Sequence, residues 1–464
     1  MVKKQALKFS LLLLIPLCLG FYLNTVGLDA QQSLSVAMLL VSVLGTLFFW
    51  EFRLSFVFIG TALLLITKVI DVEHLVWFSS LEIILFLVGM MVMMGLLKEA
   101  GFFAWLVTLI LRIRNLTAQK FFFAITIISA LLACAIDEVT SIVFMVAAIL
   151  EICDYFEVDP VPYIISSVLA TNIGSAGTVL GNPIGILIAT KAGLHFEDFL
   201  IKAFPIMLLC LFVTILILKT FYRRALKHLD DNIKELGANE FLVRLISIPP
   251  DKQLKTCLGI FGASLVLISL HHRLELALDL PINTILLVTP LIFAGIVMVW
   301  KRERARHYIE TDVEWWTLLF FLLLFAQTGA LKYTGASDVL VKKLFAAVNY
   351  NTEALVGVIL WVSAILSSVL DNVIVVAAFV PILQSVKEMG LAAENLWWAL
   401  LFGGCLGGNI SLVGSTANIV ALGILEKERA IKISFWHWLK IGFVVGVITT
   451  FICWVCLLYL PLYR

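Results

Sequence analysis

Charged side chains are scarce in this sequence. Lysine, arginine, aspartate and glutamate make up 14% of the 464 residues, whereas 62% are apolar and the mean hydropathy is +1.06. A soluble domain of this length would need far more polar surface, so the composition excludes that class. We expect an all-α polytopic membrane protein, integral to the lipid bilayer. The net charge of +1 identifies no partner, and we expect no nucleic-acid partner.

A cysteine framework is also lacking. Most of the eight cysteines lie in apolar runs, and the one close pair, Cys453 and Cys456, lies in the last of these runs. This spacing argues against disulfides or a zinc site, and it indicates packing residues instead. We predict no metal ligands and no organic cofactor, leaving only a bound Na+ or a coupled proton to consider.

The chain lacks the residue patterns of enzymes and of ATP-driven pumps. No histidine-rich cluster accompanies a nucleophile, so we expect no enzyme, and the seven histidines lie near expected loops. Nothing in the loops resembles an ATP-binding motif, so a primary pump would require a separate ATPase subunit.

An internal duplication is present. Gly95 to Gly101 aligns with Gly329 to Gly335, and the same offset of 234 positions aligns Asp137 with Asp371. An offset of 233 positions aligns a later polar loop, Thr178 to Asn182, with Ser411 to Ser415. A nearly constant offset that carries glycines, a lysine and an aspartate is poorly explained by composition, so we infer two repeats.

In the first repeat, two apolar stretches are interrupted by polar residues. The stretch 121–152 has its acids at the centre, which predicts a re-entrant hairpin rather than a straight span, and 161–190 predicts a broken helix. Intramembrane carboxylates are functional candidates. The candidate ion-binding residues of this half are Asp137, Glu138, Thr140, Ser141, Asn172, Gly174, Thr178 and Asn182.

The second repeat shows the same two interruptions. We predict a hairpin over 354–388 and a broken helix over 395–424, where a glycine loop with hydroxyls and amides would leave backbone groups free for a ligand. The candidate binding residues of this half are Asp371, Asn372, Gly408, Asn409, Ser411, Ser415 and Asn418. We expect the polar loops of both halves to surround one shared site near the membrane midplane.

Structural roles for these residues are open alternatives. The glycines could simply allow helices to approach closely. Asp137 and Asp371 could cap half-helices, and Glu138 could face the rest of the protein or a water-filled vestibule without taking part in transport. Adjacent carboxylates in a low dielectric should not both remain ionised, which favours a proton on one of them.

The distribution of lysine and arginine predicts the orientation in the membrane. The basic cluster at 301–306 and the basic connector are expected in the cytoplasm, and the acidic loop at 71–79 outside. This places the N-terminus inside, on a retained first helix, and the C-terminus outside. The predicted divisions are an N-terminal repeat with leading scaffold helices (1–220), a cytoplasmic connector (221–255) and a C-terminal inverted repeat (256–464). Aromatic belts at the membrane surfaces are predicted for Trp315, Trp316, Trp397, Trp398, Trp436 and Trp438.

Several motifs carry a family resemblance. Ser129 to Met145, Leu370 to Val373, and Gly407 to Val420 resemble elements of the ion transporter superfamily, in the branch with arsenite permeases, sodium/proton antiporters and the melanosomal P protein. Val313 to Leu318 is similar to the segment that opens the second half of that citrate-transporter-like domain. The resemblance implies a scaffold domain, a moving transport domain and a homodimer.

Two positions depart from that branch. Asn182-Pro183-Ile184-Gly185 stands where the branch usually has Asp-Pro-Pro-Asn, which removes a carboxylate and an amide. Glu138 stands where an asparagine is usual, which adds a titratable group.

Together these features predict a secondary active transporter that works by alternating access. The resemblance favours proton-coupled exchange of a small inorganic ion, of the arsenite/anion efflux or sodium/proton antiport type. The alternatives are a sodium-coupled di- or tricarboxylate transporter and an ion channel. In a prokaryote the protein would lie in the inner or plasma membrane.

Overall fold

The computed structural model describes six stretches of the chain, namely residues 2–25, 27–113, 115–235, 251–348, 351–390 and 394–463. Within them the secondary structure is helical, with no β-strand. Seven of the described helices are long and apolar enough to cross a membrane, or eight if one bent pair counts as a span. Large apolar side chains are exposed along the outer helices, as a lipid-facing surface requires. The all-α polytopic fold class is confirmed.

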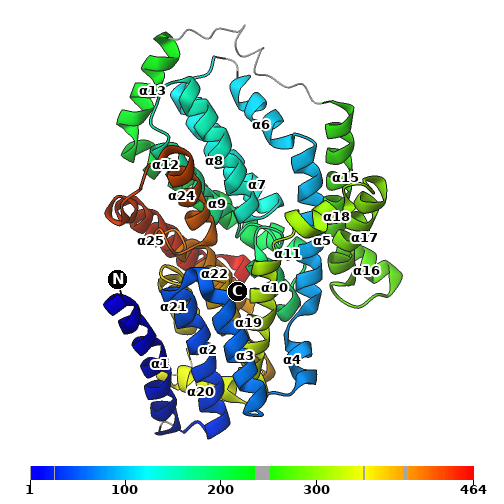
Figure 1. The fold of residues 1–464 in the computed structure, drawn as a ribbon, viewed down its shortest axis with the longest axis vertical. Helices are drawn as coiled ribbons and strands as arrows, with labels where there is room; N and C mark the ends of the chain where they lie inside the picture. Colours follow the sequence, from blue (N-terminus) through cyan, green and yellow to red (C-terminus); the bar gives the residue numbers. More distant parts are fainter. Residues whose placement is uncertain are drawn as a thin grey trace.

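Three leading helices, α1 (Val2–Thr25), α2 (Ala30–Phe48) and α3 (Arg53–Ile66), lie side by side at the lower end of the view (Figure 1). The start of α2 is fixed by a capping box, in which the Asp29 carboxylate accepts from the Gln32 amide N–H and the Gln32 side chain accepts from that of Asp29. A short helix, α4 (Val72–Phe78), follows and is capped by Asp71.

The first repeat contains both predicted interruptions. Its hairpin is formed by two helices that meet at Ile136 and Asp137, and its broken helix by two helices joined through residues 175–182. The elements are α5 (Leu81–Glu99), α6 (Phe102–Leu111), α7 (Ala118–Ala135), α8 (Glu138–Tyr155), α9 (Val161–Gly174), α10 (Pro183–Ala192), α11 (Phe196–Asp198), the π-helical η2 (Phe199–Ala203) and α12 (Phe204–Phe221).

The second repeat has the same order of elements. They are α19 (Trp315–Tyr333), α20 (Ala336–Ala347), α21 (Thr352–Ser367), α22 (Asn372–Glu388), α23 (Glu394–Gly407), α24 (Thr416–Arg429), α25 (Phe435–Tyr459) and a final 3-10 turn, η4 (Pro461–Tyr463). In both halves the first hairpin helix packs on the first half of the broken helix, α7 on α9 and α21 on α23.

The segment that leads from α12 to α19 is also largely helical where it is described, and it includes the predicted connector and the first part of the predicted C-terminal repeat. It contains α13 (Arg223–Glu235), α15 (Lys252–Ser269), α16 (His271–Leu278), α17 (Thr284–Trp300), α18 (Ala305–His307) and the π-helical η3 (Tyr308–Asp312). Much of the predicted connector, 236–250, lies outside the described residues. Helices α15, α16 and α17 gather beside α5 at the right of the view (Figure 1).

Equivalent glycines make the same close contact between broken helix and hairpin in both repeats. A Cβ on Gly174 would lie 2.1 Å from the Ala130 carbonyl oxygen, and one on Gly407 would lie 2.3 Å from that of Ala364. These pairs are related by the offsets of 233 and 234 seen in the sequence. Only glycine permits so close a backbone approach, so the broken helix is seated on the hairpin in the same way twice.

The equivalent helices α5 and α19 run in opposite directions. Glu82 near the start of α5 pairs with Lys191, whereas Lys98 near its end pairs with Asp312, which lies three residues before α19. The end of α19 carries Lys332, which lines the same surface depression as Lys191. Opposed directions of equivalent helices are the arrangement expected of inverted-topology repeats.

Some of the tryptophans predicted to form aromatic belts are buried inside the protein. Trp397 is 2% exposed and Trp398 is 0% exposed, because α23 is surrounded by other helices, and the Trp398 ring lies against Phe199. Trp438 is likewise buried and donates its indole N–H to the Asn409 carbonyl oxygen at 3.1 Å. The belt prediction was wrong for these three residues.

Candidate substrate and ion site

Two aspartates at the hairpin tips cap helices. The Asp137 carboxylate accepts a hydrogen bond from the Thr140 amide N–H at 2.8 Å, at the start of α8. Asp371 accepts from the Val373 amide at 3.0 Å, at the start of α22, and also from the Thr416 hydroxyl at 2.5 Å. A carboxylate at a helix N-terminus satisfies otherwise unpaired amides and is favoured by the helix dipole. Both residues therefore have the structural role that the sequence left open.

Glu138 has a different environment. It is 2% exposed, and its Oε1 accepts a hydrogen bond from the Asn372 side-chain amide at 2.9 Å. Its Oε2 is also buried and accepts no hydrogen bond from the described residues. Glu138 and Asn372 occupy equivalent positions in the two repeats, so the hairpin tips meet through this pair. A buried carboxylate oxygen without a donor is costly unless a proton, water or cation satisfies it.

The second half of each broken helix begins at a polar cap. Asn182 caps α10, where its Oδ1 accepts from the Gly185 amide at 2.8 Å, and Ser415 occupies the equivalent position in front of α24. The Asn182 side-chain amide also donates to the Ser175 hydroxyl and to the Cys405 sulfur, which lies in the second repeat. Asn182 stands where the resembling branch usually has an aspartate. Its side-chain N–H groups make these two contacts, which an aspartate could not make as a donor.

The loops of the two broken helices meet at a cluster of three asparagines. The Asn172 side-chain amide donates to the Oδ1 atoms of Asn409 and of Asn418, both at 2.9 Å. Asn418 in turn donates to the carbonyl oxygens of Gly408 and Ser411. The Oδ1 of Asn172 is buried and accepts no hydrogen bond from the described residues. Residues of both repeats therefore lie together, as the shared-site hypothesis requires.

The equivalent hydroxyls Thr178 and Ser411 point elsewhere. Each donates to a carbonyl oxygen on the adjoining hairpin, Thr178 to that of Cys134 and Ser411 to that of Ser368. Ser141 is fully buried, and its hydroxyl has no hydrogen-bond partner among the described residues. The first two side chains are therefore engaged in fixing the broken helix to its hairpin.

A cavity of about 230 Å³ lies beside the first hairpin tip. Four of the predicted site residues line it, namely Asp137, Glu138, Thr140 and Asn182. It extends from the buried Glu138 to Lys98, whose side chain is 61% exposed at the surface. The remaining predicted residues do not line this cavity. Asn172, Asn409 and Asn418 form the separate asparagine cluster, and the others make the hairpin, cap and helix contacts of their own elements.

Sequence reasoning missed several residues that line this cavity. Asp312 at the end of η3, Glu314 at the N-cap of α19 and Thr317 in its first turn contribute polar groups. Thr416 contributes a hydroxyl from α24. Methionines of α5 form an apolar wall. Two acids directly before an apolar span were a usable signal, because Glu314 lies in the segment that carried the resemblance. Nothing in the sequence indicated that α19 would approach the hairpin tip.

Comparison with known proteins places the chain in a family. Residues 45–403 match the model of a family described as citrate transporter. An uncharacterized transporter of Mycobacterium tuberculosis is 29% identical over 398 residues, which cover 84% of this chain and 89% of that protein. The human P protein is 28% identical over 459 residues, and this chain spans about half of its length, 54%.

A solved structure supports the fold. The YdaH transporter of Alcanivorax borkumensis superposes with a TM-score of 0.55 over 86% of this chain and 89% of that chain, at 13% sequence identity. At that identity the likeness concerns the fold alone. The resemblance inferred from the motifs is confirmed, and the chain belongs to the citrate transporter family.

Proposed function

We propose that this membrane transporter exchanges a small inorganic cation for protons by alternating access. The observation that carries the proposal is the buried Glu138 carboxylate, which lies between the two hairpin tips, lines the cavity and has one oxygen without a described donor. Such a group gains stability when it takes up a proton or contacts a cation. Loading one and releasing the other on opposite sides of the membrane is the elementary event of exchange.

The charge of the cavity favours a cation over an anion. The described residues that line it contribute four carboxyl groups, those of Asp137, Glu138, Asp312 and Glu314, and one ammonium group, that of Lys98. The Lys98 Nζ atom lies 3.4 Å from Asp312 Oδ1, so this carboxylate already offsets the positive charge of Lys98. An anion entering this space would meet like charge in a region of reduced dielectric.

The unpaired amide oxygen of Asn172 supports a second cation-binding position. This oxygen lies next to the Asn409 and Asn418 side chains, in a cluster built by both repeats. Amide and carbonyl oxygens at broken helices suit small cations. In this proposal the ion bound there would leave when the two repeats shift relative to each other.

A carboxylate transporter is the second candidate, because the family is described as citrate transporter. Its substrate would have to enter the acidic cavity together with protons or metal cations that offset its charge. Sodium-coupled uptake is the specific form of this alternative. Homodimer formation, implied by the resemblance, remains part of the proposal in both cases.

The test is flux into liposomes that contain the purified protein. Transport of Na+, K+ and citrate would be measured with an imposed pH gradient and, separately, with an imposed sodium gradient. We expect cation movement that follows the pH gradient and is accompanied by opposite proton movement. Citrate uptake driven by sodium, without response to pH, would support the second candidate instead. Sustained current far above carrier turnover would indicate a channel.

A further inference from the structure

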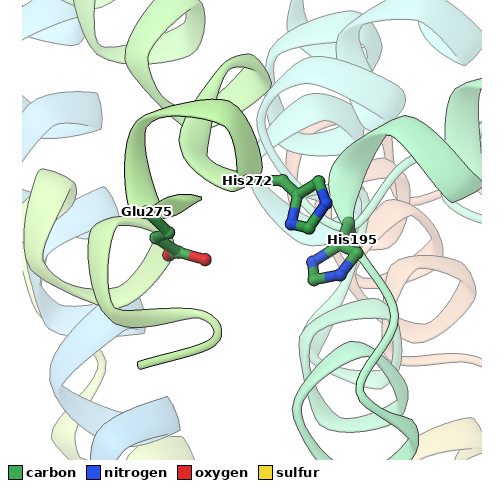
Figure 2. Close-up of side chains that lie close together, drawn as sticks. All are labelled: His195, His272 and Glu275. Carbon is green, nitrogen blue, oxygen red and sulfur yellow. The ribbon is translucent and has the colours of Figure 1, made fainter. Parts of the chain in front are cut away.

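Two histidines and a glutamate from separate parts of the chain meet at one edge of the molecule. His195 lies in the loop between α10 and α11, whereas His272 and Glu275 lie three positions apart on α16 (Figure 2). One potential ligand atom from each of the three side chains lies within 4.8 Å of the other two. The rings of His195 and His272 are stacked, with centroids 3.8 Å apart.

The glutamate of this group is held in place by the backbone. Glu275 is 3% exposed, and its two oxygens accept hydrogen bonds from the amides of Ile285 and Asn283, at 2.8 and 3.0 Å. Each oxygen keeps a free lone pair. No lysine or arginine among the described residues forms an ion pair with Glu275. A fixed, buried carboxylate of this kind is prepared to bind a cation, since its backbone partners orient it as outer contacts orient metal ligands.

His195 is also available as a ligand. The Nδ1 atom of His195 is buried and has no hydrogen-bond partner among the described residues. An imidazole nitrogen with no hydrogen-bond partner can offer its lone pair to a metal.

We propose that His195, His272 and Glu275 form a binding site for Zn2+ or a similar transition-metal cation. Two imidazoles and a carboxylate are a typical ligand set for zinc, with water in the fourth position. Mg2+ and Ca2+ prefer sets made of oxygen alone, so this group discriminates against them. Metal bonds of about 2.0–2.2 Å would require the ligand atoms to come closer together, so the two histidine side chains would rotate toward the carboxylate that the backbone holds.

The proposed metal site lies between two parts of the protein that could move relative to each other. His195 follows α10, which is the second half of the first broken helix, whereas α16 belongs to the group of helices beside α5. An exposed ion pair, Arg273 with Glu197, crosses the same junction at 2.9 Å. A bound metal would fasten the end of the broken helix to α16 and oppose any movement between them.

The test uses the full chain in detergent, stripped of metal and titrated with Zn2+ in competition with a chromogenic chelator. We expect one Zn2+ per chain, a Tm that rises with Zn2+, and no displacement by a tenfold excess of Mg2+. His195→Gln and His272→Gln should each weaken binding by at least about tenfold, since loss of even an outer contact of a metal ligand costs about 10–100-fold. Both variants leave Glu275 in place, so its hydrogen bonds with the Asn283 and Ile285 amides at the start of α17 are kept.

The matched control is His437→Gln, which removes an exposed imidazole outside the cluster. It should bind Zn2+ as the parent does. Absence of stoichiometric binding by the parent would overturn the proposal. So would unchanged affinity in both cluster variants when their Tm without metal equals that of the parent, or displacement of Zn2+ by Mg2+.

Discussion

The three acidic side chains at the hairpin tips have two different roles. Asp137 and Asp371 accept hydrogen bonds from amides that begin α8 and α22, so their charge supports the fold. Glu138 supports no helix end, and its one described hydrogen bond comes from a side chain of the other repeat. The effects of substitution should therefore separate folding from transport.

The first prediction concerns Glu138→Gln. Glutamine has nearly the same shape and keeps an oxygen that can accept from Asn372, so the thermal unfolding midpoint should stay close to that of the parent. It cannot release a proton, so flux driven by a pH gradient should fall to the level of empty liposomes. Glu151→Gln, an exposed position on the same helix, is the control and should retain full flux. Full pH-driven flux in Glu138→Gln would contradict the proposed role.

The second prediction concerns Asn182, the cap of α10. Asn182→Ala should lower the free energy of unfolding by about 0.5–2 kcal/mol, the usual cost of losing a helix N-cap. Asn182→Asp should keep the cap, since a carboxylate accepts from the Gly185 amide and suits the helix dipole. Denaturant unfolding in detergent measures both. Equal loss in the two variants would show that the contacts with Ser175 and Cys405 matter more than the cap.

Single side chains were only partly predictable. The offset of 234 identified Asp137, Asp371 and their neighbours, because a duplicated polar residue stands out in an apolar chain. It could not show that Glu138 and its equivalent Asn372 touch, since contact between repeats depends on how the helices pack. Thr416 was missed for the same reason, although it follows Ser415 directly.

At the scale of helices, the fold depends on close backbone contacts between the hairpins and the broken helices. The third prediction follows from these contacts. Gly174→Ala should destabilise the protein by about 1–3 kcal/mol, the usual cost of overpacking, because the added methyl group would meet the Ala130 carbonyl oxygen. Gly407→Ala should behave alike.

Gly259→Ala serves as the control for this pair. Gly259 lies within α15 with open space around it, so alanine should be neutral or slightly stabilising through its higher helix propensity. Unfolding midpoints measured in one detergent would compare the three variants. A neutral Gly174→Ala would mean that α7 and α9 can separate without cost.

The helices themselves could be predicted well from the sequence. Polar residues within apolar runs mark hairpin tips and helix breaks, because unpaired backbone groups are tolerated only where other groups satisfy them. Which faces of a helix are buried could not be predicted, because a lipid-facing and a protein-facing surface are equally apolar. Trp397 and Trp398 show this limit, since their chemistry suits a membrane surface but α23 is enclosed.

In the whole molecule, ion pairs between residues far apart in the sequence lie at the two opposite ends of the spanning helix α5. Lys98 pairs with Asp312 at one face, whereas Glu82 pairs with Lys191 at the other. The fourth prediction assigns these faces. A cysteine introduced at exposed Lys227 of α13 should react only after the membrane is permeabilised, and one at exposed Val76 of α4 should react from outside.

Native cysteines leave a low background for this labelling. Among the eight, Cys18 is exposed and the others are buried, so the experiment requires Cys18→Ser as its starting variant. Reaction of the Lys227 position with an impermeant reagent applied outside would reverse the predicted orientation, and with it the predicted places of both termini.

The contact between Glu138 and Asn372 has a consequence for how the two repeats can evolve. Equivalent residues that touch must lie beside the axis that relates the halves, so a perfectly duplicated ancestor would have placed two identical side chains against each other there. Two glutamates would repel, and two asparagines would carry no charge. The present pair combines one acid with one amide, so the repeats cannot accumulate changes independently at this point. A substitution at either position changes the partner of the other, and the chain keeps a single carboxylate there, with an amide to donate to it, only while its halves remain different.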